Sequence, residues 1–171
     1  MKFKNLQNIL GELIVERAQL ELGTTRTLYG RKVRRVASDK LRKGLSFSVN
    51  GKKLNFNTNQ NYGVFIHYGV NGTKTKYGST FSYGSKQPPL EPILQWMKIK
   101  GVRVRKANGG FDKQTPQKVK GLAFAIARKV KERGIAPLPY YDIAIGHVLR
   151  TKKDLIEKAV VKEIELQINF D

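Results

Sequence analysis

The chain has 171 residues, and its 33 Lys and Arg outnumber its 13 Asp and Glu to give a net charge of +20 at pH 7. It contains no cysteine, which excludes a disulfide framework and a thiolate zinc site. No apolar run approaches the roughly 20 residues that a bilayer span requires, and the N-terminal segment turns acidic at Glu12 instead of ending in a signal-peptide cleavage site. The sequence predicts a soluble, intracellular protein made without a signal peptide.

The positive charge is concentrated in the middle of the chain. Residues 22–141 hold 25 bases and 4 acids, whereas residues 1–21 and 142–171 are each neutral to within one charge. Residues 40–90 carry eight Lys and Arg and no Asp or Glu. A field of one sign repels itself and is normally tolerated only beside something negative. We therefore expect an acidic neighbour, for which composition alone leaves nucleic acid, an acidic protein surface and anionic lipid open.

The first part of the chain predicts a helix and then a hairpin. Apolar residues at helical spacing indicate a helix over roughly 4–22, ended by the following glycine. Residues 24–36 are basic and β-branched, and we leave them open between a mobile arm and a second short helix. Alternating apolar residues flank Asn50-Gly51, the φ > 0 pair of a tight turn, and predict a β-hairpin. A third strand is expected over residues 62–68.

A long loop is predicted over residues 69–92, which contain four glycines and a pair of prolines. A loop of this length in a compact domain is usually functional or disordered. We interpret it as an extended arm that becomes ordered on a neighbouring subunit and lacks partners within a single chain. Its aromatic and proline residues are the candidate interface residues: Tyr77, Phe81, Tyr83, Pro88 and Pro89.

Helix signals recur after the loop. Pro92 is placed as in a first helical turn, and Gly101 marks the end of that helix. Thr115-Pro116 opens the helix with the clearest amphipathic pattern in the chain, which ends at Gly134.

The last helix completes an α+β fold. Thr151 with Asp154 three residues later matches a capping box and predicts a helix over 151–168. We expect a small antiparallel sheet, made of the hairpin and the third strand, packed with the N-terminal helix and two to three C-terminal helices. The long loop 69–92 is inserted into a single domain that spans residues 1–171.

The residues that catalysis would need are dispersed. The two histidines, His67 and His147, lie 80 residues apart in apolar contexts. The four acids of the basic middle do not share a helical turn, whereas metal-dependent nucleases need several carboxylates that converge on divalent cations. The glycines after residue 69 fit neither a phosphate-binding loop nor a dinucleotide-binding pattern. We expect no enzymatic activity, no cofactor and no metal site.

Three blocks of the sequence follow one another in an order that a known family shares. ASDKLRKGLSFSV (37–49) is similar to an element in which a helix ends and the first strand begins, and YGVFIHYGVNGT (62–73) to a strand that ends in Tyr-Gly before an extended loop. The third block combines a short tryptophan helix (88–102) with a helix that closes in Gly-Ile (121–145). In these blocks the chain resembles the neck proteins of tailed bacteriophages, the head-to-tail joining or tail-completion class. Asp39 stands where the class usually has glycine, and because Asp tolerates the αL conformation, the bend is expected to persist.

The resemblance implies a structural virion protein made in the host cytoplasm. Its subunits would form a ring in the neck between portal and tail, lining or surrounding the DNA channel. Its partners would be further copies of the chain, the portal and other neck or tail proteins, with non-specific contact to genomic double-stranded DNA and no membrane. Seven bases in loops and helix ends are our candidates to face DNA or an acidic partner: Arg31, Arg34, Arg35, Lys98, Arg103, Arg105 and Lys106.

Two other functions stay open at this point. A non-catalytic nucleic-acid-binding protein of phage replication or packaging would use the same bases as phosphate contacts. A nuclease or another phosphoryl-transfer enzyme would need a cluster of acids or a pair of histidines, which the sequence does not show.

Overall fold

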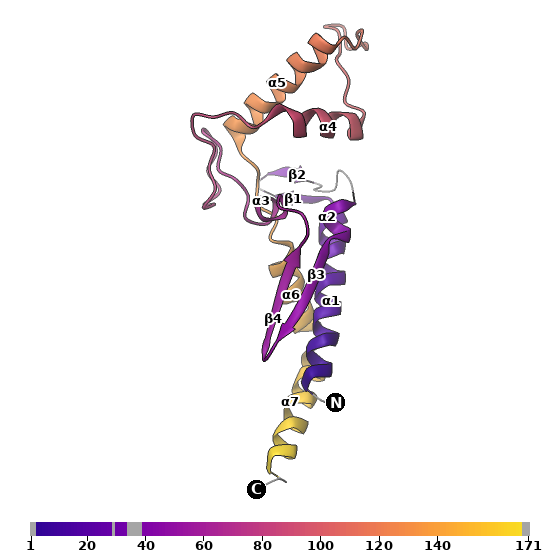
Figure 1. Cartoon of the computed structure of the whole chain (residues 1–171), viewed down its shortest axis with the longest axis vertical. Helices are drawn as coiled ribbons and strands as arrows, with labels where there is room; N and C mark the ends of the chain where they lie inside the picture. Colours follow the sequence, from indigo (N-terminus) through magenta and orange to yellow (C-terminus); the bar gives the residue numbers. More distant parts are fainter. Residues whose placement is uncertain (1–2, 29, 34–38, 169–171) are drawn as a thin grey trace. The chain divides into compact units, whose positions relative to one another are not determined.

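A computed structural model of the chain describes residues 3–28, 30–33 and 39–168 (Figure 1). The chain groups into two compact units. The terminal unit comprises Met1–Thr27, Arg31–Gly63 and Pro139–Asp171, and the central unit comprises Leu28–Gly30 and Val64–Leu138. The elements make a small α+β fold, as the sequence predicts. The single domain expected over residues 1–171 stays a prediction.

The terminal unit is built on the first helix, α1 (Phe3–Gly23), which confirms the helix predicted there. Its buried side chains recur every four residues and form one apolar stripe: Leu6, Leu10, Ile14, Ala18 and Leu22. Side chains at this spacing share one face of a helix. One carboxylate joins that face, because Glu21 is only 1% exposed and pairs with Arg17 at 2.6 Å.

The predicted hairpin is confirmed as β3 (Leu45–Asn50) and β4 (Lys53–Thr58), an antiparallel pair in which Phe47 faces Phe56. Gly51 has φ +58°, as the tight turn requires. Helix α6 (Tyr140–Thr151) holds both strands, because the Tyr141 hydroxyl donates to the carbonyl oxygens of Ser46 at 3.2 Å and Asn57 at 2.7 Å. Burial raises the pKa of this phenol, with a further contribution from the neighbouring Tyr140.

Two segments before the hairpin differ from what was expected or left open. Where described, residues 24–36 form β1 (Arg26–Leu28) and β2 (Arg31–Val33), a two-stranded sheet and therefore neither an arm nor a helix. Asp39 precedes the short helix α2 (Lys40–Lys43) with φ −68°, so the expected αL bend is absent. Its carboxylate instead pairs with Arg42 at 3.1 Å.

The third strand predicted over residues 62–68 is wrong, because Gly63–Tyr68 is the short helix α3. The sheet of the hairpin therefore has two strands. The periodicity of a short apolar run does not distinguish a strand from a helix. The β-propensity of its residues is also easily overridden by tertiary packing. The packing at Gly63 is visible: a Cβ there would lie 2.8 Å from the side chain of Thr58 and 3.3 Å from the Tyr140 hydroxyl.

The last helix, α7 (Lys153–Ile168), follows α6 without the predicted capping box. Thr151 is the final residue of α6, and its hydroxyl donates to the carbonyl of His147 at 2.9 Å. A threonine hydroxyl commonly bonds back to the carbonyl four residues earlier in a helix. The Thr151–Asp154 spacing therefore marks the end of α6, and the predicted capping box at the start of α7 is wrong.

The central unit contains the other two predicted helices, α4 (Leu90–Lys100) and α5 (Pro116–Arg133), which pack on each other. Gly101 ends α4 in the αL conformation with φ +63°, and Thr115 caps α5 by accepting a hydrogen bond from the backbone amide of Lys118. Among the described residues, no helix is long and apolar enough to cross a membrane.

Candidate interaction surface

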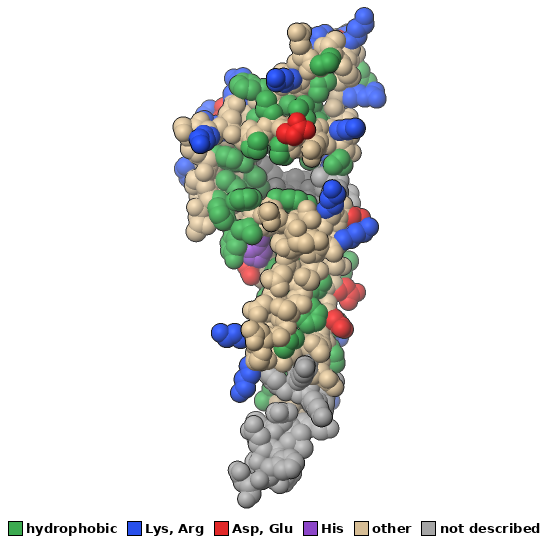
Figure 2. All heavy atoms as spheres, in the orientation of Figure 1, with side chains coloured by type: hydrophobic (Ala, Val, Ile, Leu, Met, Phe, Trp, Pro, Cys, Tyr) green, Lys and Arg blue, Asp and Glu red, His purple; other side chains and the backbone are tan. Residues whose placement is uncertain are grey.

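The central unit leaves many of its large apolar side chains exposed to solvent. Apart from Pro88, its buried apolar side chains, among those described, are few and mostly small: Val70, Met97, Ala123, Ala127, Ala136 and Leu138. Five of its aromatic side chains are between 40% and 60% exposed: Phe65, Tyr68, Trp96, Phe111 and Phe124. Figure 2 shows hydrophobic side chains at the surface beside Lys and Arg around α4 and α5. Extensive exposed apolar area among polar residues is typical of a surface that another molecule covers.

The long loop of this unit is folded around Asn71, which is 8% exposed. The Asn71 side-chain oxygen accepts from the amide of Tyr77 at 2.7 Å, and its nitrogen donates to the carbonyl of Ser79 at 2.6 Å. The backbone amide of Asn71 donates to Phe81, and its carbonyl accepts from Tyr83. Because one buried side chain connects both limbs of the loop, the loop has a defined conformation within a single chain.

The same loop closes the C-terminal end of α5. The last carbonyls of a helix have no partner within the helix. Here the amides of Thr73 and Lys74 donate to the carbonyls of Lys131 and Glu132 at 2.9 and 2.8 Å. Gly72 makes this approach possible, since a Cβ there would lie 2.3 Å from the Glu132 carbonyl oxygen. The loop is therefore part of the central unit's framework.

The predicted arm residues lie on this folded loop. Phe81 packs edge to face on Phe65 with ring centroids 4.9 Å apart, and burial raises the pKa of the Tyr83 phenol. Pro88 is buried, and Pro89 is the N-cap residue of α4. The prediction that the loop lacks partners within one chain is therefore wrong. A role of these residues in a subunit interface stays a prediction.

The segment between α4 and α5, residues 102–114, folds back on itself and is called the basic hairpin below. Arg105 and Phe111 form an antiparallel bridge across it. Near its tip, the amide of Lys106 donates to the carbonyl of Gly110 at 2.7 Å. The segment between the two predicted helices thus has its own backbone pairing.

Two arginines of the basic hairpin lie over one aromatic ring. The guanidinium carbon is 5.6 Å from the Phe111 ring centroid for Arg103 and 5.1 Å for Arg105. Both distances fall within the range of a cation–π interaction. Residues two apart in extended backbone point to the same side, so the two positive charges are presented together, while the Phe111 ring itself is 60% exposed.

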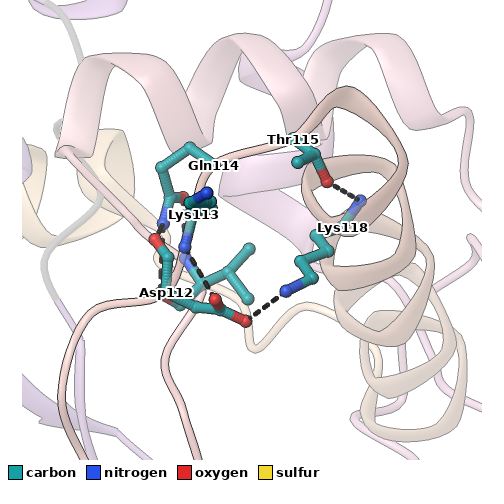
Figure 3. A network of polar contacts seen from close by, with 6 residues as sticks. Asp112, Lys113, Gln114, Thr115 and Lys118 are labelled. Atoms are coloured by element: carbon teal, nitrogen blue, oxygen red, sulfur yellow. Dashed lines mark hydrogen bonds and ion pairs between the residues drawn. The ribbon is translucent and has the colours of Figure 1, made fainter.

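A network of polar contacts fixes the base of this hairpin (Figure 3). The Val104 amide donates to the side-chain oxygen of Gln114 at 2.9 Å, and the Gln114 side-chain nitrogen donates back to the Val104 carbonyl at 3.1 Å. Asp112 accepts from the Lys118 ammonium at 2.6 Å. This hydrogen bond, followed by one from the amide of Lys113, lowers the pKa of the Asp112 carboxyl. The basic hairpin is therefore attached to the first turn of α5.

The charge of the central unit is almost entirely positive. Residues 64–138 hold fifteen Lys and Arg and three acids, a net charge of +12. Two of the three acids are paired with lysines: Asp112 with Lys118, and Glu132 with Lys129 at 3.2 Å. The hydrogen bond from Lys129 lowers the pKa of Glu132. The acids thus neutralise nearby lysines and leave the rest of the positive charge open to a partner.

The structure brings together three of the seven predicted bases, those of the basic hairpin. Lys98 is exposed on α4 of the same unit. Arg31 begins β2, but its side chain lies outside the described residues, as do Arg34 and Arg35 entirely.

Sequence reasoning missed Phe111 and Asn71. The signal for Phe111 is its place after two glycines in a basic loop, where an apolar residue has no core to enter. The Asn-Gly pair at residue 71 is a turn signal, but nothing local indicates how many partners its side chain finds. Among the residues described, no group of three or more His, Asp or Glu is placed to hold a metal ion.

Comparisons with known proteins give no match: no protein-family model, no curated protein and no solved structure is significantly similar to this chain.

Proposed function

We propose that this chain is a structural subunit of a ring in the neck of a tailed bacteriophage, between portal and tail. The observation that carries the proposal is the central unit, which combines a small core, five partly exposed aromatic side chains and a net charge of +12. Such a unit gains stability when neighbours cover its apolar surface and an acidic partner offsets its charge. A subunit of a ring around DNA meets both conditions.

The resemblance to neck proteins supports the same proposal. Two of its three blocks correspond in part to elements of the structure: α2 followed by β3 in the first block, and α4 with the end of α5 in the third. In the block at 62–73 the expected strand is a helix, so that block supports the proposal only through the loop that follows.

The experiment that tests this proposal is quantitative mass spectrometry of purified particles of the phage that encodes the chain. A ring subunit is expected at a small, fixed copy number per particle, with a constant ratio to the portal protein. Detection in infected-cell lysate, together with absence from purified particles, would contradict the proposal.

A second candidate function is favoured by the basic hairpin: a non-catalytic nucleic-acid-binding protein of replication or packaging. Arg103 and Arg105, which lie over the Phe111 ring, suit contacts with phosphates both in a neck ring and on intracellular DNA. The two candidates differ in where the chain is found. The second predicts the chain on intracellular DNA and absent from particles, whereas the first predicts it in the particles.

A further inference from the structure

The basic hairpin positions its charges before any partner arrives. Phe111 contacts both guanidinium groups, the Arg105–Phe111 bridge fixes the distance between the two limbs, and Gln114 joins their ends. Long side chains normally lose conformational freedom when they bind. Much of that cost is already met here, because the aromatic contact restricts both arginines in the free chain.

The chemistry of the hairpin fits a polyanion. Arg103, Arg105 and Lys106 are exposed, and the one acid of the segment, Asp112, is hydrogen-bonded to Lys118. A partner at this surface therefore meets positive donors and needs closely spaced acceptors. The guanidinium carbons of Arg103 and Arg105 lie 5.6 and 5.1 Å from one ring centroid. Two positive groups held at one ring suit a nucleic-acid strand, which carries a negative charge on every nucleotide.

Duplex DNA fits better than an acidic protein because the positive charge is spread widely. Bases continue from the hairpin along α5 to its last turn, where Lys131 and Arg133 lie. A protein surface usually carries both positive and negative charges, so a complementary surface on the central unit would need acidic as well as basic residues. Residues 64–138 supply three acids against fifteen bases. A DNA backbone is negatively charged along its whole length, so binding to it requires no acidic residues on this surface.

We propose that the basic hairpin is a phosphate-contact element for duplex DNA, in which Phe111 acts as the platform that holds Arg103 and Arg105. The duplex is the genome that the proposed ring surrounds, so the biological setting rests on the proposed function. The contact itself is sequence-independent, because it reaches phosphates and not base edges. Phe111 thereby acquires a role in DNA binding without touching a base.

The test uses the full chain and a short fluorescent duplex of mixed sequence, with fluorescence anisotropy measured over a series of salt concentrations. Replacing both arginines, R103Q/R105Q, should lower the slope of log affinity against log salt by about 1.8, since each phosphate contact contributes about 0.9. At about 0.1 M salt this corresponds to a roughly 60-fold loss of affinity. The matched control is K52Q/K53Q, which removes two exposed lysines of the terminal unit and should leave the slope unchanged.

Two variants separate the platform from the charge. F111L keeps an apolar side chain but removes the aromatic face, and R103K/R105K keeps the charge but removes the planar guanidinium groups. Each should weaken duplex binding about threefold, the size of a single exposed cation–π contact, with an unchanged salt slope. Circular dichroism melting should show that both variants fold like the parent chain, because the substituted side chains are exposed.

Four results would overturn the inference. Equal losses in R103Q/R105Q and K52Q/K53Q would show that binding depends on total charge and not on the basic hairpin. Unchanged affinity of F111L for the duplex would show that Phe111 does not position the two arginines. Tighter, Phe111-dependent binding to single-stranded DNA would indicate base stacking. Equal competition by a polyglutamate peptide would favour an acidic protein partner. None of these results bears on whether the chain occurs in phage particles, so the proposed neck location is tested separately.

Discussion

The terminal and central units differ in how they treat their large apolar side chains. Of the described residues, the terminal unit buries Leu6, Ile14, Leu22, Leu41 and Tyr140 to 3% exposure or less, on elements that are far apart in the sequence. In the same set, and apart from one proline, the central unit buries six apolar side chains, half of which are alanines, and five of its aromatic side chains are 40% to 60% exposed. A protein interior stabilises a unit in proportion to the apolar area that it removes from water. The terminal unit therefore draws more stability from its own core, and our proposal is that partners complete the central unit.

Charge separates the two units only in part. The terminal unit holds 18 bases and 10 acids, a net charge of +8, whereas residues 64–138 hold 15 bases and 3 acids and carry +12. Self-repulsion of this size destabilises a compact unit that already has a small core. The central unit compensates locally through hydrogen bonds: Asn71 organises its long loop, and that loop closes the end of α5. These hydrogen bonds therefore supply part of the stability that buried apolar side chains supply in the terminal unit.

The largest expected effect is the loss of a core side chain in the terminal unit. Leu22→Ala should lower the free energy of unfolding by about 3 kcal/mol, because it removes a fully buried leucine and leaves a cavity. Leu22 is 1% exposed. Urea denaturation followed by circular dichroism measures the change. The control is Leu20→Ala on the same helix, where the side chain is 54% exposed; its cost should stay below about 0.5 kcal/mol. Equal effects of the two variants would contradict the assignment of this core.

A smaller loss is expected where the loop of the central unit meets α5. Gly72→Ala places a Cβ 2.3 Å from the Glu132 carbonyl oxygen and 2.4 Å from the Gly134 amide nitrogen. The backbone must shift, at a cost of about 2 kcal/mol. Hydrogen exchange should show the loss at the amides of Thr73, Lys74 and Thr75, which donate to the carbonyls of Lys131 and Glu132 at the end of α5.

Gly121→Ala is the matched substitution within the same unit. No atom lies within 4 Å of a Cβ at this position in α5. Alanine is a better helix former, so thermal melting should show a gain of about 0.8 kcal/mol. Destabilisation by this variant would mean that another part of the molecule covers Gly121.

Substitution of the exposed apolar residues of α4 should affect assembly and not folding. Trp96 is 40% exposed and Ile99 55% exposed. The double variant Trp96→Gln/Ile99→Gln should change the free energy of unfolding by less than about 1 kcal/mol, yet lose ring assembly in light-scattering measurements with the neighbouring virion proteins. The corresponding change in the terminal unit, Leu149→Gln, should leave assembly intact. Normal assembly of the α4 variant would contradict the role given to this helix.

The smallest effect concerns acid pH. The hydrogen bond from Lys118 holds the pKa of Asp112 below its ordinary value of 3.8. A carboxyl with a lowered pKa in the folded state stabilises that state above the ordinary pKa, and the contribution is lost as the pH falls through the lowered pKa. Asp112→Asn should therefore destabilise the chain slightly at neutral pH, and its effect should shrink as the pH falls below 3.8 and disappear once Asp112 is protonated in the folded chain. A difference that persists at the lowest pH would assign the effect to packing.

The sequence predicts the elements whose signals are local. The α1 stripe, the Asn50-Gly51 turn, the αL glycine after α4 and the Thr115 cap all appear where propensity and spacing place them. Residues 62–68 were assigned to a strand because apolar β-branched and aromatic side chains fit both states, and the choice depends on the packing around Gly63. The partners of Asn71 and Phe111 depend on contacts across a loop and a hairpin, which neither composition nor periodicity encodes.

The central claim is that partners complete the central unit and not the terminal one. Hydroxyl-radical footprinting, read by mass spectrometry, tests it by comparing the isolated chain with the same chain in purified particles. Trp96, Phe111 and Phe124 should be strongly protected in the particle, while Leu20 and Leu149 keep the reactivity that their exposure in the single chain predicts. Unchanged reactivity of the three aromatic side chains in the particle would contradict the account.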